Sequence, residues 1–104
     1  MEKKKYSQFL TNEDKLNISF TQNKGQILEF SVNYSAEIGG KWRYIMRIDN
    51  CHGKPHKHLY YLHRRQFKVV LDSDTNSVFT WAKKYILRDF QKIKENYIRV
   101  KPKI

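Results

Sequence analysis

The sequence has little cysteine and no long hydrophobic run. Cys51 is the only cysteine among 104 residues, which excludes an internal disulfide and a metal site built from cysteines alone. A reducing cytoplasm is the simplest setting for such a chain. No stretch approaches the roughly 20 apolar residues that a transmembrane helix needs, and the charged start lacks the apolar stretch of a secretory signal. We therefore expect a cytoplasmic protein that does not enter a membrane.

Acidic residues are scarce, and so are the glycine-rich signatures of nucleotide chemistry. The chain has 10 Asp and Glu against 21 Lys and Arg, a formal net charge of +11. A charge this large on a small domain favours a phosphate backbone, an acidic protein or an anionic membrane as the partner. The alternative is a generic lysine-rich surface. The sequence contains no Walker motif, phosphate-binding glycine-rich loop or nucleophile elbow.

The length and the apolar content predict one folded domain, residues 1–104. Hydrophobic residues make up 39% of the chain and aromatic residues 14%, enough to build a modest core. Residues 1–14 are mostly polar and charged, and we expect a basic N-terminal arm there. The tail 99–104 is also basic.

Alternation of apolar and polar residues predicts an antiparallel sheet over residues 15–72. Strands are expected at 16–22, 26–37 and 41–49, separated by the turn signals Asn23-Lys24-Gly25 and Gly39-Gly40. In the third strand the alternation places Trp42, Tyr44, Met46 and Ile48 in the core, and it places Arg43, Ile45, Arg47 and Asp49 outside. Two further strands are expected at 56–62 and 67–71.

Apolar residues at helical spacing predict one long helix over residues 76–98, after several N-cap candidates at 72–77. The expected fold class is α+β: a curved antiparallel meander of four to five strands, with the C-terminal helix packed on one face.

The chemistry-bearing residues gather in one short segment. Three of the four histidines, His52, His56 and His58, lie within seven residues. Arg47 and Asp49 come just before them. If a strand begins at His56, then His56 and His58 share a face about 7 Å apart.

This pattern suits acid–base chemistry on a phosphodiester. Histidine exchanges protons near neutral pH, and metal-independent RNA cleavage needs a base, an acid and a cation near the phosphate. We therefore take His56 and His58 as the candidate acid and base. Asp49 would orient an imidazole, and Arg47, Lys54 or Lys57 would supply the cation.

Two alternatives stay open for the same segment. His-x-His beside an aspartate also suits a metal ion, although the sequence spells out no full ligand set, and we expect neither a metal nor a cofactor. The histidines could instead be surface residues at a junction between a strand and a loop.

Basic and aromatic side chains elsewhere extend the candidate interface. Tyr60, Tyr61 and Trp42 could stack on bases or fill the core of the sheet. The candidate nucleic-acid-binding residues are Arg43, Lys54, Lys57, Arg64 and Arg65.

The stretch from Arg47 to His58 resembles the TumE-like toxin family and related small prokaryotic families. The matching positions are Arg47, Asp49, Asn50, Gly53, His56 and His58. The sequence departs from the pattern at Ile48, where an aromatic residue is usual, and at Pro55. The resemblance implies a toxin of a two-gene toxin–antitoxin system that acts on translation, with a helix-turn-helix antitoxin as partner.

These observations predict a toxin-like protein that acts on RNA or on the ribosome, as a metal-independent ribonuclease. One alternative is a non-enzymatic basic module that binds nucleic acid or protein. The other is a small His-x-His metalloprotein. The sequence leaves open whether the chain forms a homodimer.

Overall fold

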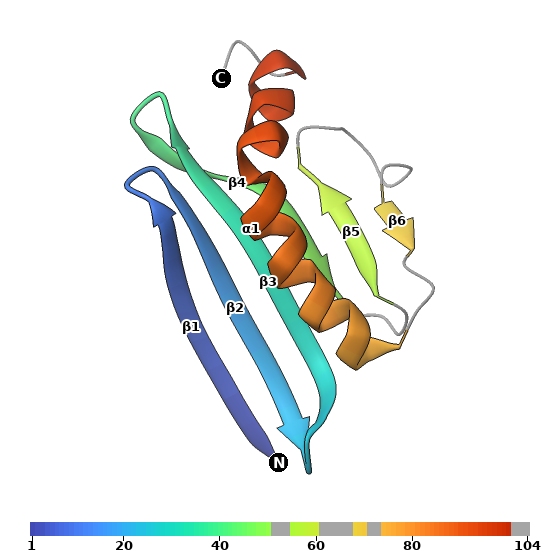
Figure 1. Cartoon of the computed structure of the whole chain (residues 1–104). Helices are drawn as coiled ribbons and strands as arrows, with labels where there is room; N and C mark the ends of the chain where they lie inside the picture. Colours follow the sequence, from blue (N-terminus) through green and yellow to red (C-terminus); the bar gives the residue numbers. More distant parts are fainter. Residues whose placement is uncertain (51–54, 61–67, 71–73, 101–104) are drawn as a thin grey trace.

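The computed structural model describes residues 1–50, 55–60, 68–70 and 74–100, with only the backbone of 68–70. One antiparallel sheet and one long helix make up this part of the chain (Figure 1). The elements are β1 (Glu2–Thr11), β2 (Asp14–Asn23), β3 (Gln26–Ile38), β4 (Lys41–Asp49), β5 (His56–Leu59), β6 (Lys68–Val70) and α1 (Thr75–Val100).

The sheet is an open antiparallel meander in which the spatial order of the strands is their order in the chain. This confirms the α+β class and the packing of one C-terminal helix on one face. The β2–β3 turn holds Lys24 and Gly25 at positive φ, 52° and 78°, and the β3–β4 turn holds Gly39 and Gly40 at 65° and 80°. Glycine adopts such angles without steric cost. Both turns therefore lie at the positions that the sequence predicts.

The sheet has one strand more than the four to five expected, because the N-terminal segment is a strand and not an arm. β1 pairs with β2 from Glu2 opposite Gln22 to Thr11 opposite Asp14. Nearly all of its side chains are exposed. A strand that is exposed on both faces shows no apolar alternation, and its ladder of backbone hydrogen bonds leaves no trace in the sequence.

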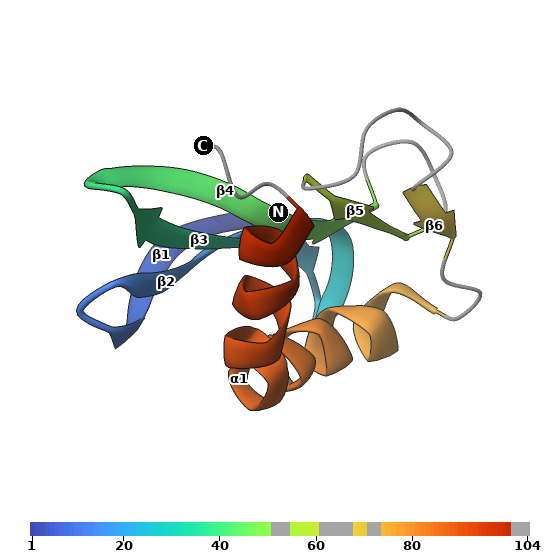
Figure 2. The same cartoon turned by 90° about the horizontal axis from the view of Figure 1, so that it is seen from above.

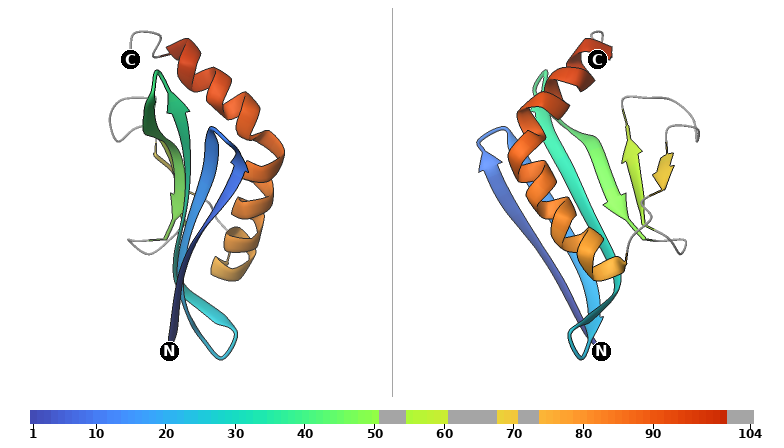
Figure 3. Two further views of the ribbon diagram at one scale, coloured as in Figure 1. Left: turned by 90° about the vertical axis from the view of Figure 1, so that its left-hand side faces the viewer. Right: turned by 45° about the vertical axis from the view of Figure 1, so that its right-hand side comes forward.

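The core lies between α1 and one face of the sheet. Figures 2 and 3 show the helix on that side, with the other face of the sheet turned away from it. Buried side chains of the helix are Val78, Phe79, Ala82, Ile86, Ile93 and Tyr97, and they meet the apolar rows of β2, β3 and β4. We call the sheet face turned away from α1 the outer face.

The helix is slightly longer than the predicted 76–98. It begins after Asp74, whose Oδ1 accepts a hydrogen bond from the N–H of Ser77 at 3.0 Å, as an N-cap does. It continues to Val100, so Arg99 and Val100 belong to the helix and not to a tail. Residues 101–104 lie outside the described residues.

A β-bulge in β4 overturns the predicted orientation of its first half. Tyr34 pairs with Met46 but Ser35 pairs with Tyr44, so Ile45 is an extra residue without a partner in the ladder. Ile45 is therefore fully buried, whereas Trp42 and Tyr44 are 40% and 62% exposed. The sequence analysis placed these three residues the other way round, because strict alternation takes no account of an inserted residue.

Candidate functional site

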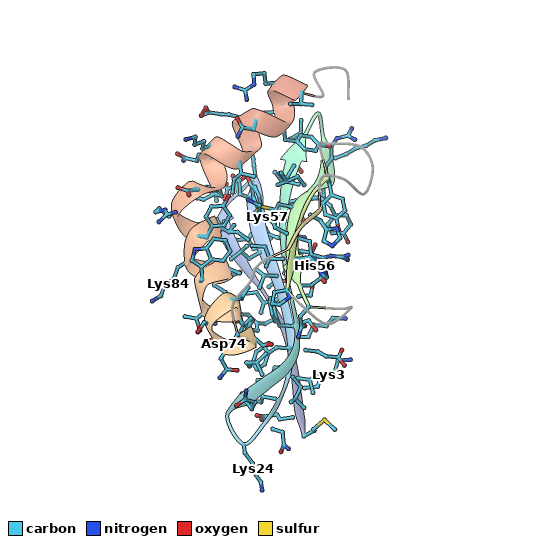
Figure 4. All side chains as sticks on the ribbon, turned by 90° about the vertical axis from the view of Figure 1, so that its right-hand side faces the viewer. Lys3, Lys24, His56, Lys57, Asp74 and Lys84 are labelled. Carbon is cyan, nitrogen blue, oxygen red and sulfur yellow. The ribbon has the colours of Figure 1, made fainter. Side chains whose placement is uncertain are left out.

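Four of the predicted site residues meet on the outer face, where β4 pairs with β5. Arg47 lies opposite His58, and Asp49 lies opposite His56. Residues that lie directly opposite each other project to the same side of a sheet. Figure 4 shows His56 on the side of the sheet that faces away from the helix. We call Arg47, Asp49, His56 and His58 the β4–β5 cluster.

The carboxylate of Asp49 lies at the centre of this cluster. Its Oδ2 is 2.6 Å from Nε of Arg47 and 3.8 Å from Nε2 of His58. The rings of His56 and His58 have centroids 6.1 Å apart. A guanidinium and the imidazole of His58 therefore lie against one carboxylate, with His56 opposite Asp49 in the neighbouring strand. Such a carboxylate can hold an imidazole in a fixed orientation.

Burial divides the cluster into an inner and an outer part. Asp49 and His56 are 1% and 8% exposed, whereas the side chains of Arg47 and His58 are 35% and 26% exposed. A buried carboxylate is stable only with a charged or hydrogen-bonding partner, and Arg47 provides one. A molecule on the outer face would therefore meet His58 and Arg47 first, with Asp49 behind them.

Tyr60 follows β5 and lies beside the cluster. Its N–H donates to the carbonyl of Ile45 at 3.1 Å, and its ring centroid is 6.0 Å from that of Tyr44. Burial raises the pKa of the Tyr60 hydroxyl, Arg47 opposes that rise, and Asp49 adds to it. The hydroxyl is therefore protonated at neutral pH and can donate a hydrogen bond.

Asn50 matches the sequence motif but has a structural position. Its Oδ1 accepts the N–H of Phe30 at 2.9 Å, and its Nδ2 donates to the carbonyl of Leu28 at 3.0 Å. The side-chain amide thus fastens the end of β4 to β3, directly after Asp49. In this chain the amide of Asn50 therefore fixes the backbone next to Asp49.

A polar groove of about 620 Å³ lies beside the cluster. Its lining combines short polar side chains of β1, β2 and β3 with lysines and Tyr44. Two lining residues, Ser31 and Asn33, pair directly with Asp49 and Arg47, so the groove leads to the cluster. The lining residues are Lys5, Tyr6, Ser7, Lys15, Asn17, Ile18, Ser19, Ser31, Asn33 and Tyr44.

This groove is not evident from the sequence, since serine and asparagine at alternate positions resemble the pattern of any solvent-facing strand. A smaller hollow of about 200 Å³ adjoins it, lined by Ser19 and Ser31 and also by Lys3 and Asn50. Figure 4 shows Lys3 on the same side of the sheet as His56. The signal that could have revealed the groove is the run of short polar residues at matching positions of two paired strands.

Two predicted interface residues lie on the other face of the sheet. Lys57, labelled in Figure 4, pairs with the core residue Ile48. Its Nζ lies 5.5 Å from the ring centroid of Tyr85 in α1. Arg43 pairs with Ala36, a core residue, and donates from Nε to the carbonyl of Ile38 at 3.4 Å. Neither residue joins the β4–β5 cluster.

The remaining predicted contacts, Lys54, Arg64 and Arg65, lie outside the described residues, as do Cys51, His52 and Gly53. Within the described ranges, no group of three or more His, Cys, Asp or Glu side chains is arranged to hold a metal ion. Over the same ranges, no helix combines the length and the apolar character needed to cross a bilayer.

Comparison with known proteins gives one result. No curated protein and no solved structure matches the chain. A family model matches residues 1–103, almost the whole sequence. The chain therefore belongs to the family described as a domain of unknown function, DUF7718.

Proposed function

We propose that this protein binds RNA on the outer face of its sheet and cleaves it without a metal ion, using the β4–β5 cluster. The observation that carries the proposal is the position of the Asp49 carboxylate, 2.6 Å from Arg47 and 3.8 Å from His58, with the His56 ring 6.1 Å from that of His58. Two imidazoles can serve as the base and the acid of this reaction, a guanidinium as its cation, and the carboxylate can orient an imidazole. The net charge of +11 supports an anionic polymer as the substrate.

The proposed reaction is transfer of a phosphoryl group within the RNA. One imidazole, in its neutral form, accepts the proton of a 2′-hydroxyl, and the 2′-oxygen bonds to the adjacent phosphorus. The bond from phosphorus to the 5′-oxygen breaks, and the other imidazole, in its protonated form, gives that oxygen its proton. The products are a 2′,3′-cyclic phosphate and a free 5′-hydroxyl. Asp49 orients His58, and the positive charge of Arg47 offsets the charge that develops on the phosphate.

The biological setting that we propose is a toxin–antitoxin system, in which cleavage of RNA stops translation in the cytoplasm. This part of the proposal depends on the motif from Arg47 to His58. It implies a cognate antitoxin with a helix-turn-helix. Induced expression in a bacterial host should arrest growth, and the double substitution His56→Ala and His58→Ala should restore it.

A direct assay tests the chemistry. Purified protein is incubated with a mixed-sequence RNA in the presence of EDTA, and the ends of the products are identified. Cleavage should persist in EDTA, and the double histidine variant should lose at least about 100-fold in rate. Thermal unfolding of both proteins checks that the variant folds. Full cleavage by the double variant would overturn the catalytic assignment.

A second candidate function is a binding module without turnover. The observation that favours it is the burial of Asp49 and His56, 1% and 8% exposed, which suits a cluster that only joins β4 to β5. That function predicts RNA binding that weakens steeply with salt, no cleavage products, and unchanged affinity in the double histidine variant.

A further inference from the structure

The bulge at Ile45 places large aromatic side chains on the face that carries the β4–β5 cluster. Tyr44 and Arg47 are three residues apart, a spacing that in a regular strand puts them on opposite faces. The extra residue Ile45 turns Trp42 and Tyr44 outward, to the side of Arg47 and Asp49. Bulges beside functional sites often re-aim a side chain in this way.

These residues form an aromatic shelf, which we define as Phe9, Trp42 and Tyr44. They are 62%, 40% and 62% exposed. Phe9 and Trp42 make an edge-to-face contact with centroids 6.1 Å apart. Nζ of Lys15 lies 4.5 Å from the centroid of Trp42 and 5.8 Å from that of Phe9. The shelf thus combines the ring pair of Phe9 and Trp42, which has a cation beside it, with the ring of Tyr44 on the same face of the sheet, opposite α1.

The shelf, the polar groove and the β4–β5 cluster are continuous. Tyr44 and Lys15 line the groove, and Tyr60 links Tyr44 to the neighbourhood of Arg47 and Asp49. Because of the bulge, Tyr44 and Arg47 lie opposite Ser35 and Asn33, which are two residues apart in β3, or about 7 Å along the strand. A strand of nucleic acid with one base on Tyr44 therefore reaches the cluster within one or two nucleotides.

We propose that the aromatic shelf stacks the bases of single-stranded RNA and so directs the neighbouring phosphodiester to the β4–β5 cluster. This inference rests on the proposed function and adds the substrate class. Exposed rings bind bases by stacking, and only unpaired bases present their faces to a protein side chain. The lysines at the shelf and the groove, Lys15 and Lys5, complement the phosphates of such a strand.

The two tryptophans of the chain give a direct probe. They are Trp42 on the shelf and Trp81 on the helix. In a Trp81→Phe background, the fluorescence of Trp42 alone reports on the shelf. A single-stranded RNA 12-mer should quench this emission, and a blunt duplex of the same sequence should not.

Substitutions at Tyr44 test the energetics. Tyr44→Ala should weaken binding of the single-stranded 12-mer about 5- to 100-fold, the range for one stacked base. Tyr44→Phe should retain the affinity, because it keeps the ring, and Trp81→Phe serves as the control on the other face. Tyr44 is mostly exposed, so Tyr44→Ala should unfold at the same temperature as the parent protein.

The outcomes separate this inference from the proposed function. Equal binding of duplex and single-stranded RNA, or unchanged affinity in Tyr44→Ala, would overturn the shelf while leaving histidine-dependent cleavage intact. Quenching by the single strand without cleavage by the parent protein would support the shelf and overturn the ribonuclease. Quenching by neither RNA would overturn the shelf and point to another partner, such as a protein.

Discussion

Asp49 and Arg47 form an ion pair of unequal burial: Oδ2 and Nε lie 2.6 Å apart, but the side chain of Asp49 is 2% exposed and that of Arg47 is 35% exposed. Removal of one partner takes the nearest opposite charge away from the other. That loss costs more for the buried carboxylate than for the guanidinium, which keeps contact with water.

We therefore predict that Arg47→Ala destabilises the protein more than Asp49→Asn does. Arg47→Ala removes the nearest cation from a buried carboxylate, and we expect a loss of about 3–5 kcal/mol in the free energy of unfolding. Asp49→Asn leaves a partly hydrated guanidinium and should cost about 1–2 kcal/mol. Urea denaturation of both variants measures the difference. Equal losses would show that the buried carboxylate does not depend on Arg47 more than Arg47 depends on the carboxylate.

The bulge at Ile45 predicts a second asymmetry. Ile45→Ala removes a fully buried side chain and should cost about 2–5 kcal/mol. Tyr44→Ser, one residue earlier, removes a larger side chain that is 62% exposed and should cost less than about 1 kcal/mol. The same denaturation experiment compares them. A larger loss of stability in Tyr44→Ser than in Ile45→Ala would contradict the bulge and support strict alternation of the side chains in β4.

These two residues also show where sequence reasoning succeeds and where it stops. Alternation of apolar residues predicts β2, β3 and β4, and helical spacing predicts α1, because each of them buries one face against the core. Alternation cannot show an inserted residue, since Ile45, Met46 and Ile48 are apolar in either register. Only the pairing of Ser35 with Tyr44 shows that the side chains before the bulge are turned over.

In the candidate site, too, some features follow from the sequence and others depend on how the strands pair. Two-residue spacing correctly places Arg47 on the same face as Asp49, and His56 on the same face as His58. The same spacing puts Lys57 on the opposite face from both histidines, a consequence that the predicted interface overlooked. Burial of Asp49 depends on neighbouring strands, and so does the polar groove. Neither property follows from local periodicity.

A third prediction concerns Tyr34, which joins the sheet to the helix. Its hydroxyl donates to Oδ1 of Asp14 at 2.6 Å, and Nζ of Lys94 in α1 lies 3.5 Å from the same oxygen. Burial, and then the contact with Asp14, raise the pKa of Tyr34 above its ordinary value of 10.0. The folded state therefore keeps the phenolic proton at a pH where the unfolded chain releases it.

The sign of the effect follows from linkage. Below pH 10 the tyrosine is protonated in both states and its contribution is complete. As the pH rises above about 10, only the unfolded chain loses the proton, and stability falls. The free energy of unfolding of the parent protein should therefore drop more steeply above this pH than that of Tyr34→Phe. Parallel curves would show that the hydrogen bond to Asp14 does not shift the titration of Tyr34.

A fourth prediction tests the proposed attack by the 2′-hydroxyl. A single 2′-deoxy nucleotide at the cleaved position of an RNA oligonucleotide should abolish cleavage there, because the nucleophile is missing, while binding through the aromatic shelf is unaffected. Gel analysis of the products measures the first effect and Trp42 quenching the second. Cleavage at the deoxy position would require an attacking group other than the 2′-oxygen.

The most direct test of the account compares His58→Ala with Lys57→Ala. The two positions are adjacent in β5 but project to opposite faces of the sheet, so Lys57→Ala is a matched control for the loss of a polar side chain from this strand. The quantity to measure is the initial rate of cleavage of one single-stranded RNA in EDTA. We predict that His58→Ala lowers this rate by at least about 100-fold and that Lys57→Ala leaves it within about threefold of the parent. Equal rates in the two variants would contradict an acid–base centre on the outer face.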